Sequence, residues 1–479
     1  MKKIRIDQNI FRAYDIRGAE EAYVKSQIIK PGSLMSKSAH SAIINPDVAY
    51  VVGRGVAKLF GPGNVVVGRD ARLTSPALSR ELIRGLTDGG INVSDLGLAT
   101  SDLVYFAAGK YKFDMGIMVT GSHTIKYLNG IKICKLTNNT VTPIYCDNGL
   151  MDLAEVCKKQ QFDPVSKKGK LTDFNCIDSF TESMLSLFPK YAKFPEIKLV
   201  LDSGNGMAWS IYGKIIEALP TEIIKLNSDP DGNFPAHDPD PMVDKNMEPL
   251  IEVVRKRNAD FGVAWDGDAD RIAFITAQGE ILTGSHMGAL LLPWVAKKHP
   301  RKAVVVTPPM TKAFFEIAEE LYVPVIYAKV GNSHVKKDMD KYNSPFGAEE
   351  ADHFMFQESY GAESGIIPLL IMLERIMESR KDFDHLLCEA MRGYIVSGDV
   401  NFEVHSSQQV LSAIKKYFKK SALEIDSLDG LRVELADWRF CLRPSSIDPV
   451  VRLNLECRSK KLMKEKIFEI AEIISKARD

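Results

Sequence analysis

The sequence predicts an α/β protein with three related mixed α/β domains and a smaller α+β domain at its carboxyl-terminal end. Short apolar runs that read as strands alternate with helical spacings along most of the chain, which is typical of a parallel or mixed sheet. A strand that enters a helix through a loop recurs at 197–201 and again at 304–306, without shared residue identity. After about residue 392 the pattern changes to several apolar runs that favour antiparallel strands.

The first domain, predicted to span residues 1–167, follows this alternation. Helical spacing over 48–60 ends at Gly61. Strands are expected at 65–67, 91–93 and 115–119, and a helix at 76–87 with Ser75 as its cap. Residues 20–46 have little periodicity and many small or polar side chains, so we expect a long loop or insertion there.

The remaining domains are predicted to span 168–281, 282–392 and 393–479. Helices are expected at 207–219 and 311–321, directly after the loops that follow the strands at 197–201 and 304–306. The last domain has four apolar runs that predict strands, at 400–404, 431–435, 440–442 and 450–455. Its helices are expected at 410–418 and 462–477.

Charge and cysteine usage exclude several classes of protein. Lys+Arg and Asp+Glu are both 62, with a sequence pI of about 7.1, so no global field favours nucleic acid or an anionic membrane. The seven cysteines are scattered without a C-x-x-C pair, which favours a reducing compartment over a disulfide framework. Without an apolar signal region or a run of about 18 apolar residues, we expect a soluble cytoplasmic protein that binds neither nucleic acid nor membrane.

A serine stands at the end of the apolar run 115–119. Ser122 follows Thr120-Gly121 in a loop at the carboxyl end of the expected strand, where ligands bind in open α/β sheets. Serine alone is a poor nucleophile, so a catalytic role requires helpers from elsewhere in the chain. The alternative is an ordinary polar turn after a strand.

An acidic loop follows the buried strand expected at 261–265. Asp266, Asp268 and Asp270 alternate with Gly and Ala, so their carboxylates crowd together. Two like charges about 4 Å apart repel by about 4 kcal/mol at an effective dielectric constant of about 20, and oxygen-only ligands suit Mg²⁺. One alternative is a solvated turn whose carboxylates diverge. The other is a calcium loop of the EF-hand type, but the match is weak because Ala277 stands at the twelfth position, where that loop has a Glu ligand.

Taken together, four motifs resemble the α-D-phosphohexomutases, and among them the bacterial phosphomannomutase/phosphoglucomutase group. In chain order they are F-R-A-Y-D-I-R-G at 11–18, T-G-S-H at 120–123, N-G-I-K at 129–132 and D-G-D-A-D-R at 266–271. The resemblance extends over nearly the whole chain. It implies four domains around one central cleft, the last with a TATA-binding-protein-like fold.

The resemblance also implies roles for individual residues. Ser122 matches the serine that carries the phosphoryl group, and it binds Mg²⁺ together with the three aspartates of the acidic loop, Asp266, Asp268 and Asp270. Arg271 matches an arginine near that phosphate. Arg17 and Lys132 match residues that assist proton transfer and neutralise charge beside the serine.

On the substrate side, two further segments resemble family loops. Residues 346–353 resemble the sugar-binding loop and contain its Glu349 and His353, whereas 361–365 is a poorer match because its Glu stands beside its Ser. The segment 443–449 resembles the loop that holds the non-transferred phosphate, through Arg443, Ser445, Ser446 and Ile447. The alternative for this last segment is a proline-bounded hairpin turn.

Several positions depart from the family pattern. Thr124-Ile125 stand where Asn-Pro is usual, and Ala351 and Asp352 stand where Ser-Gly is usual in the sugar-binding loop. Asn332 occupies the place of a cleft histidine, and no lysine precedes Lys312 after the strand at 304–306. Most of these changes lie on the sugar side, so they put in question which hexose is used.

The resemblance implies a phosphohexomutase that interconverts the 1- and 6-phosphates of a hexose, mannose and/or glucose. It implies a phosphoserine enzyme, Mg²⁺, and a hexose 1,6-bisphosphate as intermediate and activator, with His353 or Lys132 as candidate base. The alternatives are a catalytically altered paralogue that binds sugar phosphates or protein partners, a phosphoglucosamine mutase, or a Mg²⁺-dependent phosphatase. A hexose phosphate is the expected partner, and the chain is expected to be a monomer or dimer.

Overall fold

The computed structural model describes residues 3–21, 24, 42–61, 63–188, 196–445 and 449–477. The chain divides into two compact units, one of Met1–Ile281 with Phe354–Met377 and one of Leu282–His353 with Glu378–Asp479. Most of the expected insertion at 20–46 lies outside the described residues. Within the described part, no helix has the length and apolar character needed to cross a membrane.

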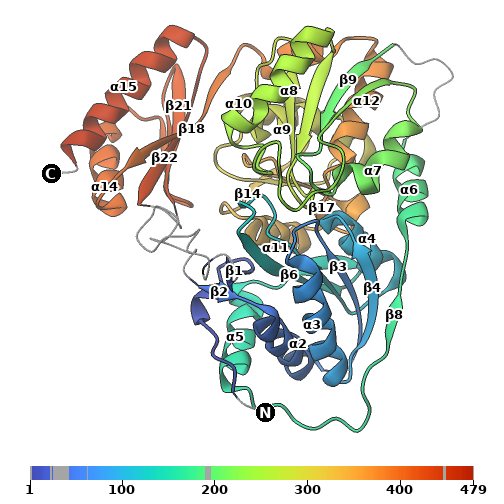
Figure 1. The fold of residues 1–479 in the computed structure, drawn as a ribbon. Coiled ribbons are helices and arrows are strands. Elements are labelled where there is room, and N and C mark those ends of the chain that lie inside the picture. The colour runs from blue at the N-terminus through green and yellow to red at the C-terminus, as the bar shows by residue number, and fades with distance from the viewer. Residues whose placement is uncertain are drawn as a thin grey trace. The chain divides into compact units, whose positions relative to one another are not determined.

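The first unit begins with a sheet of mixed direction (Figure 1), in the order β2-β1-β6-β5-β3-β4-β8, with β7 paired to β6. Strands β3, β4 and β5 are parallel, and β6 runs antiparallel to both β5 and β1. The strands are β1 (Ile16–Glu20), β2 (Ile43–Ile44), β3 (Asn64–Arg69), β4 (Asn92–Leu98), β5 (Met115–Val119), β6 (Leu128–Thr137), β7 (Thr140–Pro143) and β8 (Leu171–Asp173).

Helices α2, α3 and α5 share a hydrophobic core with this sheet. Helices α2 and α3 approach closely at two glycines, because a Cβ at Gly53 would lie 2.3 Å from Leu82 O and one at Gly85 would lie 2.2 Å from Tyr50 O. The helical elements here are η1 (Gln8–Ile10), α2 (Pro46–Phe60), α3 (Ser75–Asp88), α4 (Ser101–Tyr111), η3 (Cys146–Asn148), α5 (Leu150–Lys159) and α6 (Ile177–Ser186).

Three details of this region differ from the sequence-based expectations. Ser75 is the first residue of α3, and its hydroxyl donates to Asp70 Oδ1 at 2.5 Å; Thr74 occupies the cap position and makes no side-chain cap bond. The hydroxyl of Ser75 also accepts from Asn129 Nδ2 at 3.0 Å, so Asp70 and Asn129 are its partners and the helix end is not. The expected loop at 20–46 contains β2, which pairs in parallel with β1, and its last residue, Pro46, is the first of α2.

A second sheet in the first unit has the order β10-β9-β11-β12. Strands β10, β9 and β11 are parallel, and β12 returns antiparallel to β11, so the acidic loop is the turn of a hairpin. The elements are β9 (Lys198–Asp202), α7 (Ala208–Glu217), β10 (Glu222–Leu226), α8 (Asp244–Arg257), β11 (Phe261–Trp265) and β12 (Ile272–Thr276). The short segment of β16 (Phe354–Phe356), η4 (Gln357–Ser359) and β17 (Ala362–Glu363) also lies in this unit, where α12 (Ile367–Ser379) begins.

The second unit contains a parallel group of strands and the carboxyl-terminal domain. Strand β13 pairs in parallel with β14 and β15. The elements before the last domain are α9 (Gly284–Lys298), β13 (Val304–Val306), α10 (Lys312–Glu320), β14 (Val325–Tyr327), α11 (Asn332–Tyr342), β15 (Phe346–Ala348) and α13 (Phe383–Met391).

The last domain is an antiparallel sheet in the order β18-β22-β21-β20-β19, and two helices, α14 and α15, share its hydrophobic core (Figure 1). Its elements are β18 (Ile395–Glu403), α14 (Ser407–Phe418), β19 (Glu424–Asp426), β20 (Leu431–Glu434), β21 (Trp438–Pro444), β22 (Val450–Cys457) and α15 (Lys460–Lys476). The predicted fold class, three mixed α/β domains and a carboxyl-terminal α+β domain, is therefore confirmed.

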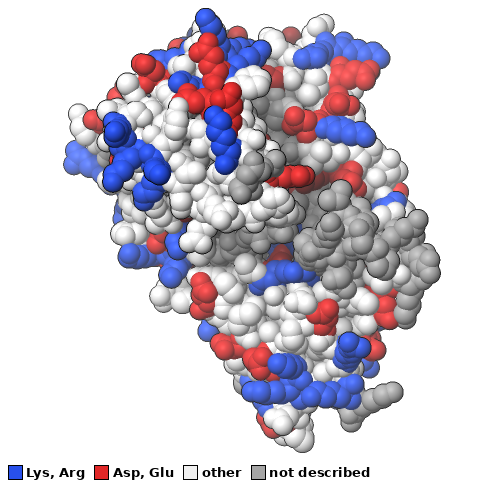
Figure 2. All heavy atoms as spheres, turned by 90° about the vertical axis from the view of Figure 1, so that its left-hand side faces the viewer, with Lys and Arg blue, Asp and Glu red and all other residues white. Residues whose placement is uncertain are grey.

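The surface carries both signs of charge. Figure 2 shows basic and acidic side chains on one face, lying among each other and among uncharged residues. This agrees with the equal numbers of basic and acidic residues in the sequence, 62 of each.

Candidate active site

The serine loop, residues 120–125, directly follows β5, whose five residues are all buried. The backbone N–H of Ser122 donates to Thr120 Oγ1 at 2.8 Å, and the same hydroxyl donates to Asp70 Oδ2 at 2.8 Å. Ser122 has a φ of +50°, in the left-handed region that costs a non-glycine residue about 1 kcal/mol or more. Such a conformation persists only where the surroundings enforce it.

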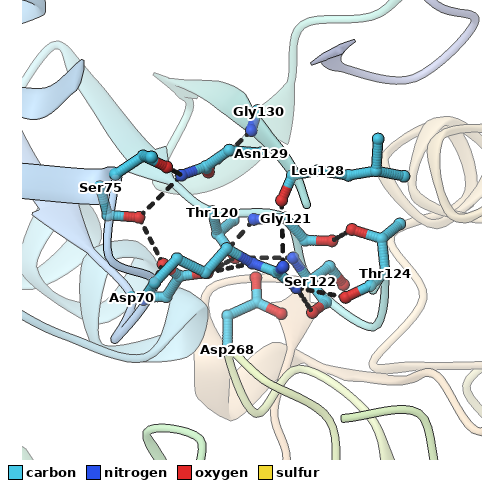
Figure 3. A network of polar contacts seen from close by, with 12 residues as sticks. Asp70, Ser75, Thr120, Gly121, Ser122, Thr124, Leu128, Asn129, Gly130 and Asp268 are labelled. Carbon is cyan, nitrogen blue, oxygen red and sulfur yellow. Dashed lines mark hydrogen bonds and ion pairs between the residues drawn. The ribbon is translucent and has the colours of Figure 1, made fainter. Parts of the chain in front are cut away.

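The side chain of Arg72 enforces the conformation of the loop, whose residues Thr120, Ser122 and Thr124 are drawn in Figure 3. It is fully buried, and each of its five N–H groups has an acceptor. Four acceptors are backbone carbonyl oxygens, those of Ser122 at 2.8 Å, Thr124 at 2.6 Å, Ile125 at 2.8 Å and Leu128 at 3.0 Å. The fifth is Asp70 Oδ2, at 3.1 Å from Nε. One guanidinium therefore determines the path of the loop.

Asp70 also supports the serine loop. Its carboxylate accepts from the backbone N–H of Gly121 at 3.2 Å and from the hydroxyl of Ser75 at 2.5 Å, in addition to Thr120 and Arg72. Gly121 must be a glycine here, because a Cβ would lie 2.4 Å from Arg72 Nε. Neither Asp70 nor Arg72 was predicted as a site residue. The available signal was their position at the carboxyl end of β3, the strand next to β5.

The acidic loop, residues 266–271, joins β11 to β12. Asp266, Asp268 and Asp270 are at most 2% exposed, and one oxygen from each lies within 4.8 Å of the others. Burial raises the pKa of Asp266 well above its usual value, and the charges of Asp270 and Asp268 raise it further. The carboxylates converge and are buried, which excludes a solvated turn with diverging side chains.

These residues fit Mg²⁺. The donors are carboxylate oxygens, which this hard cation prefers. Asp268 Oδ1 is buried and, among the described residues, has no hydrogen-bond partner. A buried carboxylate oxygen without a partner is costly unless a cation or another donor satisfies it.

The serine loop and the acidic loop meet. Ser122 Oγ donates to Asp266 Oδ2 at 2.9 Å, although the two residues are 144 positions apart. A Cβ at Gly267 would lie 2.8 Å from the Ser122 carbonyl oxygen, so a glycine is required at this contact. The hydroxyl is thus held directly against the cluster of carboxylates.

Lys132 lies beside the same cluster. It stands on β6 opposite Met118 of β5, and its Nζ is 2.6 Å from Asp268 Oδ2 and 2.5 Å from Asp270 Oδ2. Burial alone would lower the pKa of Lys132, but the carboxylates of Asp268 and Asp270 more than offset this and raise it. Lys132 is therefore an ammonium ion at neutral pH.

The other predicted cations of the first unit, Arg17 and Arg271, act electrostatically on His123, the residue after Ser122. Arg17 stands on β1 and forms an ion pair with Asp15, and the backbone N–H of Arg271 donates to Asp266 Oδ1 at 3.3 Å. Burial lowers the pKa of His123 well below its usual value, and the charges of Arg271, Arg17 and Lys132 lower it further. His123, whose Nδ1 is 3.4 Å from Ser122 Oγ, is therefore neutral. The structure brings Ser122, the three aspartates and these cations into one region.

The predicted sugar-binding residues lie in the second unit. Glu349, directly after β15, accepts from the backbone N–H of Gly331 at 2.7 Å, and its other oxygen is 3.2 Å from His353 Nδ1. Asp352 has a φ of +59°, a conformation that favours the glycine usual at this position of the family loop. Asn332 is the first residue of α11, beside Gly331.

The predicted phosphate-binding loop is described only in part. Arg443 stands on β21, and its Nη2 lies 3.8 Å from Asp399 Oδ2 on β18. The backbone N–H of Ser445 donates to Val450 O at 2.9 Å, which closes the segment between β21 and β22. Ser446 and Ile447 lie outside the described residues.

Profiles of one protein family match three separate stretches of the chain. They are the α/β/α domains I, II and III of phosphoglucomutase/phosphomannomutase, which match residues 33–144, 177–279 and 283–394.

Full-length relatives agree with these matches. A phosphomannomutase of Escherichia coli (strain K12) is 31% identical over 467 residues, 96% of each chain. A Xanthomonas campestris protein named phosphohexose mutases is 32% identical, over 97% of this chain and 98% of the other. Among solved structures, a phosphoglucomutase/phosphomannomutase family protein from Burkholderia thailandensis has a TM-score of 0.83 at 28% identity, covering 99% of this chain and 98% of the other.

Proposed function

Because the chain belongs to the phosphoglucomutase/phosphomannomutase family, we propose that it is a phosphohexomutase that interconverts hexose 1-phosphate and hexose 6-phosphate. The proposed substrates are mannose and/or glucose phosphates, in line with the description of the matching family and the names of the relatives. The observation that carries the proposal is the contact between Ser122 Oγ and Asp266 Oδ2 at 2.9 Å, because it joins a potential phosphoryl carrier to a potential Mg²⁺ site.

The proposed reaction passes through phosphoserine. The Oγ–P bond of phosphorylated Ser122 breaks while a sugar hydroxyl oxygen forms a bond to phosphorus, and the hydroxyl proton passes to a base. The product of this step is a hexose 1,6-bisphosphate. In the second step Ser122 Oγ forms a bond to the other phosphorus of the bisphosphate while the bond from that phosphorus to the sugar oxygen breaks, and the sugar oxygen takes up the proton held by the base. This leaves the isomeric monophosphate and restores the phosphoserine.

The residues around Ser122 have the charges that this transfer requires. A phosphoserine carries a charge of about −1.5 to −2 at neutral pH, and Lys132, Arg17 and Arg271 are the cations that would neutralise it. Asp266, Asp268 and Asp270, with Ser122, would hold Mg²⁺, which supplies further positive charge for the transferred group. The burial of Ser122 and of the three aspartates strengthens their charge interactions relative to water.

The remaining roles are proposed from the family resemblance. Glu349 and His353 are proposed to contact the sugar, and Arg443, Ser445, Ser446 and Ile447 to bind the non-transferred phosphate. Lys132 and His353 are the candidate bases. The ion pairs of Lys132 with Asp268 and Asp270 favour the ammonium form, so they favour His353 for this role.

Replacing Ser122 by alanine tests the proposal. We expect Ser122→Ala to abolish formation of hexose 6-phosphate from mannose or glucose 1-phosphate, with the fold retained by circular dichroism. Ser79→Ala, at a buried serine of α3, is the matched control and should keep wild-type turnover.

Intact-mass measurement completes the test. Incubation with glucose 1,6-bisphosphate should add one phosphoryl group to the wild-type chain and none to Ser122→Ala. Turnover by Ser122→Ala, or wild-type protein that never carries phosphate, would overturn the proposal. Release of inorganic phosphate without isomerisation would identify a phosphatase instead.

A further inference from the structure

The acidic loop contains a strained residue between two of its carboxylates. Ala269 has a φ of +57° and is fully buried, so a non-glycine residue occupies the left-handed region without access to water. Its backbone sets the directions in which Asp268 and Asp270 leave the loop. A relaxed conformation at Ala269 would turn one of these carboxylates away from the cluster. Neighbouring residues must therefore hold the backbone of Ala269 in its strained conformation.

Tyr212 of α7 contacts this residue directly. Its single O–H proton is shared between two acceptors, Ala269 O at 3.0 Å and Asp102 Oδ2 at 2.7 Å, and the side chain is fully buried. Its ring packs beside Trp265, the residue that precedes the acidic loop, with ring centroids 5.9 Å apart. Tyr212 therefore anchors both the carbonyl of the strained residue and the strand that leads into the loop.

Asp102 accepts from the Tyr212 hydroxyl and is itself held by Thr100 and Ser364. Asp102, in the first turn of α4, accepts from Thr100 Oγ1 at 2.5 Å and from Ser364 Oγ at 3.1 Å. Ser364 belongs to the segment 361–365, the poorer of the two matches to the family's sugar-binding loop. In the structure the hydroxyl of Ser364 bonds to Asp102, within the first unit, and so belongs to the surroundings of the acidic loop.

Gly365, the residue after Ser364, packs directly against the acidic loop. A Cβ at Gly365 would lie 2.3 Å from Ala269 O, and the carbonyl of Gly365 accepts from Trp265 Nε1 at 2.7 Å. On the other side, Ser101 donates from its backbone N–H to Asp268 O at 2.9 Å and from its hydroxyl to Asp268 Oδ2 at 2.6 Å. The loop is thus enclosed by α4, α7 and the segment after β17.

We propose that Tyr212, Asp102 and Ser364 form a loop brace, a set of positioning residues that holds Ala269 in its strained conformation so that Asp266, Asp268 and Asp270 converge. The brace deepens the proposed function and rests on it, because the convergent carboxylates are proposed to hold Mg²⁺. None of the three side chains needs to touch the ion or the substrate. They act through the backbone of Ala269, as outer hydrogen-bond partners orient metal ligands in other proteins.

The decisive variant is Tyr212→Phe, which removes one hydroxyl and keeps the ring. The first readout is titration of the full chain with MgCl₂ by calorimetry, where we expect the dissociation constant to rise about tenfold. The second is hydrogen–deuterium exchange of the amides between residues 261 and 276, which we expect to become faster whether or not Mg²⁺ is added.

Two further variants serve as control and rescue. Tyr50→Phe removes a comparable tyrosine-to-carboxylate bond, that of Tyr50 OH to Asp88 Oδ2 at 3.0 Å, on α2, and should change neither readout. Ala269→Gly in the Tyr212→Phe background removes the strain, so it should restore the Mg²⁺ affinity to within about twofold of wild type. If Tyr212→Phe does not fold, Ser364→Ala replaces it, with the same direction expected for both readouts.

The outcomes separate the brace from the proposed function. Unchanged exchange and unchanged Mg²⁺ affinity in a folded Tyr212→Phe would overturn the brace, and so would a glycine at 269 that fails to rescue. Faster exchange in a protein whose wild type does not bind Mg²⁺ would support the brace and count against the proposed metal site.

Discussion

Arg72→Lys tests whether the serine loop owes its conformation to one guanidinium. Lysine keeps a positive charge near Asp70, but it brings at most three N–H groups to a site with five acceptors. At least two acceptors then lose their donor; the acceptors on Asp70, Ser122 and Leu128 are buried, and the carbonyls of Thr124 and Ile125 are partly buried. Each buried unsatisfied group costs about 1–3 kcal/mol, so the free energy of unfolding should fall by about 2–6 kcal/mol.

The size of this loss decides how the measurement is made. A domain is typically stable by about 5–15 kcal/mol, and most of this range exceeds a loss of about 2–6 kcal/mol, so we expect Arg72→Lys to fold in the absence of denaturant. Urea unfolding followed by circular dichroism then gives the change in stability. Turnover of a hexose 1-phosphate in buffer gives the effect on the site, which should be about 100-fold if Ser122 moves by about 1 Å.

The control is Arg80→Lys on α3, where the side chain is 73% exposed and 3.9 Å from Glu81. This change should alter the free energy of unfolding by less than about 0.5 kcal/mol. If Arg72→Lys has the same free energy of unfolding and the same turnover as the wild type, the hydrogen bonds from Arg72 to the carbonyl oxygens do not hold the loop.

Two other substitutions test two buried carboxylates, Glu350 and Asp268. Burial raises the pKa of Glu350 from 4.5 to about 7. Between these values the folded chain binds more protons than the unfolded chain, so stability falls as pH rises through this window, by up to about 3 kcal/mol. Glu350→Gln should therefore flatten the dependence of the unfolding free energy on pH between 4.5 and about 7; profiles parallel to wild type would contradict this. Asp268→Asn should abolish the rise in melting temperature caused by MgCl₂, because it removes one of three converging charges; an undiminished rise would show that the cation binds elsewhere.

Local patterns in the sequence were enough to predict the two strands that carry the site. The apolar run at 115–119 and its abrupt end correctly predicted β5 and a loop at Ser122, and the run at 261–265 predicted β11 before the acidic loop. Helix α2 ends at Phe60 with Gly61 as its C-cap residue, as the helical spacing over 48–60 predicted. These features depend on the order of neighbouring residues, which is why the sequence alone reveals them.

The sequence by itself therefore determined the alternation of elements, the acidic triplet and the serine, together with the family resemblance that these motifs support. Only the tertiary structure decided what holds them. Arg72 reaches Ser122 across 50 positions, Tyr212 reaches Ala269 across 57, and Ser122 reaches Asp266 across 144. Arg72 and Tyr212 bond to the backbone carbonyls of Ser122 and Ala269. Every residue has such a carbonyl, so no residue type in the sequence marks these bonds. A buried arginine or tyrosine that supports a loop therefore cannot be distinguished in the sequence from one that only packs in a core.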